Sequence, residues 1–202
     1  TILHINDHHS NLEEKARTLR LKNASGATQS VSVSAGGFAR VVSAFAELSQ
    51  RREHVIKLHA GDALTGTLYF NRAGELGEAD AAMMSLVCFD AFTLGNHEFD
   101  KGDSSLANWL TLLHSGECQA PILSANVQFG ASSALHPSRA PVPVSPFTVV
   151  ERGGQKIGIV GLTIAEKTKV SSSPDPDTQF EDEATAAQRA IDTLRGQGVD
   201  KV

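Results

Sequence analysis

The chain has 202 residues, of which 41% are hydrophobic and 20% charged, and this length supports one sizeable core or at most two small domains. Its formal net charge of −5 argues against a nucleic-acid polymer as partner, and no apolar run approaches the ~18 residues of a membrane span. The composition also excludes collagen, coiled coils, disordered tails and disulfide-rich scaffolds.

Strand-like runs alternate with helical stretches along the chain. Apolar runs predict strands at residues 1–6, 55–59, 91–94 and 121–127. Amphipathic or apolar stretches predict helices at residues 38–48, 75–88, 104–114 and 182–195. Two strand-like runs that flank Arg152-Gly153-Gly154-Gln155 predict a hairpin. Loops are predicted at 131–146 and 171–177, and the polar stretch before Gly36 has no predicted element. The alternation predicts one α/β unit on a largely parallel sheet.

The two cysteines do not indicate the cellular compartment, because a count of two is compatible with an oxidising and with a reducing compartment. Cys88 lies in an apolar run, which favours a buried thiol over a disulfide or a metal ligand. The chain begins at Thr1 rather than at a methionine, and we therefore expect that an upstream segment, such as a signal peptide, has been removed.

Three polar clusters each follow a predicted strand directly: Asp7-His8-His9, Gly61-Asp62 and the run from Gly95 to Asp100. Ligands of open α/β sheets bind beyond the carboxyl ends of the strands, so parallel strands would deliver these clusters to one rim. The side chains brought together there would be Asp7, His9, Asp62, Asn96 and His97. Such donors suit divalent ions of the Zn, Mn, Fe or Co type. Gly61 and Gly95 permit tight turns and close backbone approach.

Each cluster alone has an ordinary structural explanation. Asp-x-His is common by chance, Gly-Asp after a strand is usually a turn, and Asn-His can cap a helix. Their joint placement at strand ends favours a metal site. The nucleophile elbow, the P-loop and the dinucleotide-binding glycine motif are all absent.

The remaining histidines are expected to have no part in the chemistry. His4 and His59 lie on predicted strands as packing or supporting groups, and His8 is expected to be the variable position between two ligands. Solvated surface positions are expected for His54, His114 and His136.

In order and spacing, these three clusters resemble the first motifs of the calcineurin-like metallophosphoesterase superfamily. The longer sequence segments at 59–70 and 93–100 resemble those of the exported bacterial 5′-nucleotidases, and most of all those of their NAD nucleotidase branch. Further likeness at 74–84, 123–127 and 167–174 extends over nearly the whole chain. The resemblance implies a layered α/β/β/α fold with mixed, largely parallel sheets, and a periplasmic or secreted location.

The resemblance also implies a role for each matching residue. Asp7 and His9 would bind a first metal, Asp62 would bridge two metals, and Asn96 would bind the second. His97 would not be a ligand but would stabilise the phosphoryl transition state or protonate the leaving oxygen, while Asp100 orients it. Two divalent ions would activate the attacking water and clamp the attacking and leaving oxygens in line. The implied substrates are nucleotides such as AMP and NMN, together with the pyrophosphate of NAD.

One departure from the family pattern concerns its later histidines. The family's lone His and its G-H-x-H segment have no counterpart, because no histidine follows His136. We therefore expect residues 1–202 to be the N-terminal part of a metallophosphoesterase catalytic domain, without the later His ligands and the C-terminal substrate domain. By itself, such a part would bind metal weakly and turn over slowly or not at all.

Two alternatives stay open. The substrate can differ within the superfamily, as for a UDP-sugar hydrolase, a 2′,3′-cyclic nucleotide phosphodiesterase or a sulfur-ester hydrolase. The chain can also be a non-catalytic binding module that keeps the fold. His97 and Asp100 count against the module, since it has no use for a catalytic pair. The residues alone do not choose among the metals, the substrates or an oligomeric state.

Overall fold

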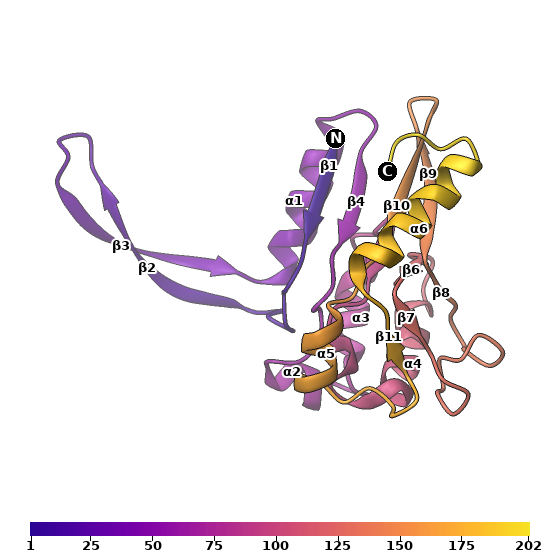
Figure 1. The fold of residues 1–202 in the computed structure, drawn as a ribbon. Helices are drawn as coiled ribbons and strands as arrows, with labels where there is room; N and C mark the ends of the chain where they lie inside the picture. Colours follow the sequence, from indigo (N-terminus) through magenta and orange to yellow (C-terminus); the bar gives the residue numbers. More distant parts are fainter.

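Five parallel strands form the central sheet, in the order β1-β4-β5-β6-β8. The computed structural model describes all residues from Thr1 to Val202 (Figure 1). The strands are β1 (Ile2–Ile5), β4 (Ile56–His59), β5 (Ala91–Thr93), β6 (Ile122–Leu123) and β8 (Val144–Ser145). Every neighbouring pair in this sheet is parallel, which confirms the predicted sheet type.

Helices on one side of the sheet enclose the main hydrophobic core. They are α1 (Phe38–Gln50), α2 (Leu68–Arg72), α3 (Glu78–Ser85) and α4 (Gly102–Leu113). Phe38, Phe92 and Trp109 are fully buried in this core. Burial of each such side chain stabilises the fold by about 1.5–3 kcal/mol. The indole N–H of Trp109 donates to the Gly77 carbonyl at 3.0 Å, which fixes α4 against the start of α3.

The other side of the sheet carries the predicted hairpin and a helix. β9 (Phe147–Arg152) pairs antiparallel with β10 (Gln155–Val160), and α6 (Glu183–Gly196) packs against β10 (Figure 1). Packing is close, because a Cβ on Gly158 would lie 2.7 Å from Leu194 Cδ1. Buried apolar residues of the sheet and of α6 lie outside the main core, namely Ile56, Ala91, Leu123, Ala186, Ala190 and Leu194. The layers follow the expected α/β/β/α order.

Short elements refine the predicted boundaries. The strand predicted at 121–127 divides into β6 and β7 (Val127–Gln128), and β7 pairs with β11 (Gln179–Phe180). The division occurs at the buried Asn126, whose amide donates to the Thr163 carbonyl at 2.7 Å. Helix α5 (Ala165–Ser171) and helix α2 were not predicted. None of the helices is both long and apolar enough to cross a membrane.

A long two-stranded ribbon occupies the polar stretch for which no element was predicted. β2 (Glu14–Lys22) and β3 (Thr28–Gly36) pair antiparallel and project away from the body of the protein (Figure 1). The alternation of Ser with Val31 and Val33 is a period-2 signal that could have identified β3. The polar composition concealed it, because both strands lie outside the core.

The expectation of a buried Cys88 thiol is wrong. Cys88 is exposed and forms a disulfide with Cys118, with their Cα atoms 5.1 Å apart. Val87 and Phe89 point into the core on either side of it, and Cys88 itself has a φ of 52°, which turns its side chain outward. The disulfide joins the end of the α3 segment to the chain that leads into β6.

Replacing both cysteines by serine should lower the free energy of unfolding by about 2–4 kcal/mol. The reason is that the disulfide restricts the unfolded chain across a sequence separation of 30 residues. Urea denaturation of the variant and the wild type measures the difference. Thiol titration is the control, since the native wild type should show no free thiol. Two reactive thiols, with stability insensitive to reducing agent, would contradict the pairing.

Candidate metal centre

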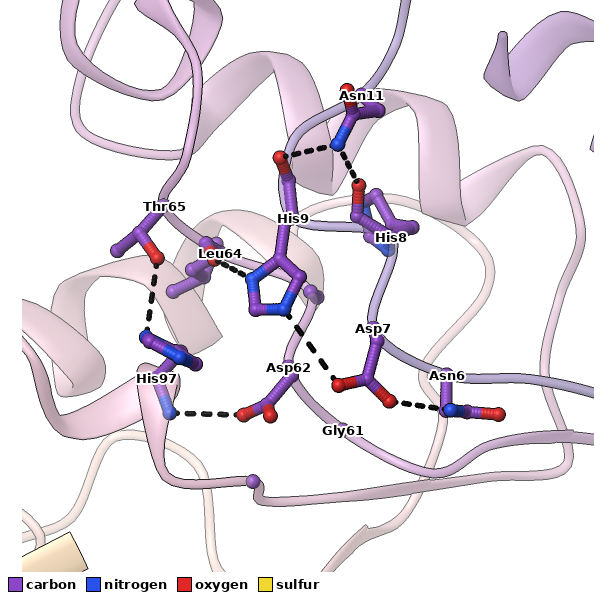
Figure 2. A network of polar contacts seen from close by, with 12 residues as sticks. Asn6, Asp7, His8, His9, Asn11, Gly61, Asp62, Leu64, Thr65 and His97 are labelled. Atoms are coloured by element: carbon purple, nitrogen blue, oxygen red, sulfur yellow. Dashed lines mark hydrogen bonds and ion pairs between the residues drawn. The ribbon is translucent and has the colours of Figure 1, made fainter. Parts of the chain in front are cut away.

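Loops that follow β1, β4 and β5 meet at the carboxyl edge of the central sheet. These strands are neighbours, and their pairing continues into the loops: Asp7 N–H donates to the Gly61 carbonyl at 3.0 Å, and His9 N–H to the Asp62 carbonyl at 3.1 Å. The amide N–H of His97 donates to Asp62 Oδ1 at 2.9 Å (Figure 2). Thus the structure brings together the three clusters that the sequence placed at separate strand ends.

Two imidazoles and one carboxylate lie close together in these loops, and a second carboxylate lies beside one of the imidazoles. One potential ligand atom from each of His9, Asp62 and His97 lies within 4.8 Å of the others. Asp7 Oδ1 lies 3.7 Å from His9 Nε2, and Asn6 donates to the other oxygen of Asp7 (Figure 2). Imidazole nitrogens and carboxylate oxygens are the donors that divalent transition metals prefer. The side chains present therefore fit a divalent metal ion.

Asn96 adds a buried amide with no partner. The residue is 3% exposed, and its side-chain amide nitrogen has no hydrogen bond. The oxygen and nitrogen of an amide are assigned from their partners, so a rotated amide would place its oxygen at this unpaired position. A buried polar atom without a partner costs about 1–3 kcal/mol. An amide oxygen facing a cation would remove that cost, and Asn96 thus fits a metal ligand.

His97 and Asp100 form a pair across one turn of chain. The short 3₁₀ helix η1 (His97–Phe99) places His97 Nδ1 2.7 Å from Asp100 Oδ2. Thr65 Oγ1 lies 3.4 Å from the same nitrogen. A carboxylate on Nδ1 fixes the orientation and tautomer of the ring, which leaves Nε2 available for the site. Both side chains are partly exposed.

Glu98 received no role from the sequence, although it lies within the cluster after β5. The residue is 2% exposed, and its carboxylate accepts N–H bonds from Asp62 at 2.9 Å, Ala63 at 2.8 Å and Gly95 at 2.6 Å. Burial raises the pKa of Glu98 to about 7, and the charge of Asp62 contributes, although the backbone N–H donors act in the opposite direction. Glu98 therefore ties the loop after β4 to the loop after β5.

His8 is not a free position between two ligands. Its side chain is largely buried, with Nδ1 2.9 Å from His59 Nε2 and Nε2 3.2 Å from Asp80 Oδ1. Burial lowers the pKa of the His59 imidazole well below its ordinary value, and His8 lowers it further. The expectation of a solvated surface position is also wrong for His114, which is half-buried. The His114 Nε2–H donates to the Ala120 carbonyl at 2.8 Å.

Strained backbone is concentrated in the same loops. Seven residues other than glycine have a positive φ, and five of them belong to the loops after β1 and β4: Asp7, His9, Ser10, Asp62 and Thr65. Each such conformation costs on the order of 1–3 kcal/mol and persists only where the surrounding structure enforces it. The loops are therefore held in place by contacts beneath them.

Gly95→Ala should weaken binding of Mn²⁺ at least tenfold, measured by calorimetric titration of the full-length gene product. A Cβ at this position would overlap Asp62 Oδ1 and lie 2.6 Å from the Asp62 amide nitrogen. Such overpacking typically costs about 1–3 kcal/mol and would displace the Asp62 carboxylate. Gly196→Ala is the matched control, because its Cβ would meet nothing within 4 Å. Wild-type affinity in Gly95→Ala would show that the close approach is not required.

Comparison with known proteins identifies the family of this chain. Residues 1–135 match the calcineurin-like phosphoesterase family. Over 202 residues, the chain is 42% identical to a probable 5′-nucleotidase of Treponema pallidum and 43% identical to an NAD 5′-nucleotidase of Haemophilus influenzae. It covers 31% of each of these proteins. The chain thus spans about a third of the length of the relatives it matches.

Two solved structures share the fold and a substantial part of the sequence. The Haemophilus influenzae NAD nucleotidase matches with a TM-score of 0.84 and 42% identity, over 98% of this chain and 32% of that one. A 5′-nucleotidase precursor from Thermus thermophilus matches with a TM-score of 0.79 and 34% identity, over 98% and 35%. The family match includes the loops after β1, β4 and β5, where the metal-type donors meet. From its sequence and its fold, the chain belongs to the calcineurin-like phosphoesterase family.

Proposed function

We propose that this chain is the metal-binding part of a metal-dependent phosphohydrolase that removes the 5′-phosphate from nucleotides. The observation that carries the proposal is the meeting of His9, Asp62 and His97 at one sheet edge, in a chain 42% identical to a probable 5′-nucleotidase. The chain covers 31% of that relative, so we assign the remaining metal ligands and the nucleoside-binding surface to other parts of the protein.

Asp7 and His9 are proposed to bind one ion, Asn96 a second, and Asp62 both. The strand order supports this division, because β4 lies between β1 and β5, and Asp62 follows β4. Asp62 is therefore the carboxylate best placed between the other ligands. Divalent ions of the Zn, Mn, Fe or Co type would supply positive charge to the phosphate and lower the pKa of the attacking water.

His97 is proposed to act on the phosphoryl group rather than to bind metal. Its Nδ1 is held by Asp100 at 2.7 Å, so its Nε2 can hydrogen-bond a phosphate oxygen or protonate the leaving oxygen. The closeness of His97 to His9 and Asp62 favours a ligand role as the alternative. The metal content of a variant without the His97 imidazole separates these two roles, because the ion would be lost only if His97 were one of its ligands.

The proposed substrates are AMP, NMN and the pyrophosphate of NAD. The two relatives named for 5′-nucleotides and for NAD are almost equally similar to this chain, at 42% and 43% identity, so we include both chemistries. We also propose a periplasmic or secreted location. The Cys88–Cys118 disulfide supports it, since disulfides persist in oxidising compartments.

His97→Ala should lower kcat for AMP about 10²–10⁴-fold while metal content stays at the wild-type level. The reason is that His97 would act on the phosphoryl group without holding the ion. The measurement combines elemental analysis with hydrolysis of AMP, NAD and UDP-glucose by the full-length gene product. His136→Ala is the matched histidine control, because His136 lies in a loop and bonds only to its neighbour Ser138 through its side chain.

Two results would count against this proposal in different ways. Loss of metal together with activity in His97→Ala would make His97 a ligand and refute its proposed role. A metal-loaded wild type that hydrolyses neither AMP nor NAD would refute the nucleotidase function, and hydrolysis of UDP-glucose alone would replace it.

A further inference from the structure

The loop that presents His9 is anchored on both sides to one buried carboxylate. His8 Nε2 lies 3.2 Å from Asp80 Oδ1, and Ser10 Oγ donates to Asp80 Oδ2 at 3.0 Å. Asp80 and Ser10 are completely buried, and the His8 side chain is 9% exposed. Each oxygen of Asp80 thus binds one neighbour of His9. No sequence signal pointed to this contact, because Asp80 is separated from His8 by 72 positions.

If both imidazoles are neutral, each hydrogen bond of this cluster has only one possible donor. Gly61 N–H donates to His59 Nδ1 at 3.2 Å, so this nitrogen carries no proton and His59 Nε2 carries it. His59 Nε2–H then donates to His8 Nδ1 at 2.9 Å, which leaves the proton of His8 on Nε2. His8 Nε2–H finally donates to Asp80. Every ring nitrogen has a partner, and the chain of bonds runs from the β4 loop to α3.

The position of Asp80 suits an acidic side chain that accepts hydrogen bonds. It lies in the first turn of α3, where the helix dipole favours negative charge. It also accepts bonds from two donors, which compensate its burial. The ring of His8 packs against Phe38 of α1, with ring centroids 4.8 Å apart. His8 therefore points into the core, while its neighbours Asp7 and His9 face the metal centre.

The anchored loop contains three of the five residues with a positive φ at this edge of the sheet. Asp7, His9 and Ser10 have φ angles of 51°, 44° and 51°. Residues held in this region need surrounding contacts to keep them there. Between Asp7 and Ser10, the side chains that reach the interior are those of His8 and Ser10, and both of them bond to Asp80.

We propose that Asp80 is a positioning residue, which holds the loop between Asp7 and His9 through His8 and Ser10 and thereby sets the affinity of the centre for its divalent ion. This inference rests on the proposed function, because it requires that the loop bind a metal. Replacing a residue that orients metal ligands typically lowers metal affinity about 10–100-fold.

Asp80→Asn tests the inference, because the amide keeps the shape of the side chain but cannot accept both bonds as the carboxylate does. The full-length gene product is stripped of metal and titrated with Mn²⁺ by calorimetry, and thermal unfolding is recorded without metal. Mn²⁺ should bind about 10–100-fold more weakly, and saturating Mn²⁺ should restore most of the AMP hydrolysis.

Asp103→Asn is the matched control for the loss of a buried carboxylate. Asp103 is likewise completely buried in the first turn of its helix, α4. It accepts hydroxyl bonds from Ser133 at 2.5 Å and Thr178 at 2.6 Å, and none from the loop after β1. This variant should lose stability as Asp80→Asn does, yet bind Mn²⁺ within about twofold of the wild type. A purely structural role of Asp80 would make the two variants alike.

Ser10→Ala keeps the inference testable if Asp80→Asn does not fold. It removes one of the two hydrogen bonds to Asp80. Mn²⁺ binding should therefore weaken about tenfold, which is the lower limit of the 10–100-fold range expected for such residues. Wild-type affinity in a folded Asp80→Asn, or in Ser10→Ala when the first variant is unfolded, would overturn the inference and leave the proposed function intact. Failure of the wild type to bind Mn²⁺ would overturn both.

Discussion

The geometry of the candidate metal centre depends on the hydrogen bonds that the Glu98 carboxylate accepts. This carboxylate accepts the backbone N–H groups of Asp62, Ala63 and Gly95, which belong to two different loops. Without it, three donors at the edge of the core would lack partners, and each would cost about 1–3 kcal/mol. The loops can share one carboxylate only because they approach closely, and a Cβ on Gly61 would lie 2.6 Å from the Gly95 amide nitrogen.

Asp80 accepts hydrogen bonds from the third loop in the same manner. Its partners are His8 and Ser10 of the loop after β1, whereas those of Glu98 lie after β4 and β5. Buried carboxylates thus stabilise a backbone that is strained at five positions, while the more exposed Asp7 and Asp62 are left to face a ligand. Acidic side chains in this fold therefore have two roles: the buried ones hold the loops, and the more exposed ones face a ligand.

The sequence predicted what depends on local pattern, and it missed what depends on distant partners. The parallel sheet, the hairpin around Gly153 and the helix capped by Asp182 follow from periodicity and turn residues, and all of them are present. The meeting of the three loops follows from strand order. The importance of Glu98 and His8 does not, because their partners lie about 35 and 72 residues away. Cys88 was misplaced for a related reason, since an apolar run does not reveal which of its residues turns outward.

The negative charge of this protein implies that the proposed metal ions act in substrate binding as well as in the activation of water. The protein carries a formal net charge of −5, and Asp7, Asp62 and Asp100 add carboxylates at the place where a phosphate would have to bind. An anionic substrate approaching these side chains alone would be repelled. Bound divalent ions would be the largest local charges and would reverse the sign of the field at this edge of the sheet. For the proposed reaction, the ions are therefore required for nucleotide binding as well as for the chemical step.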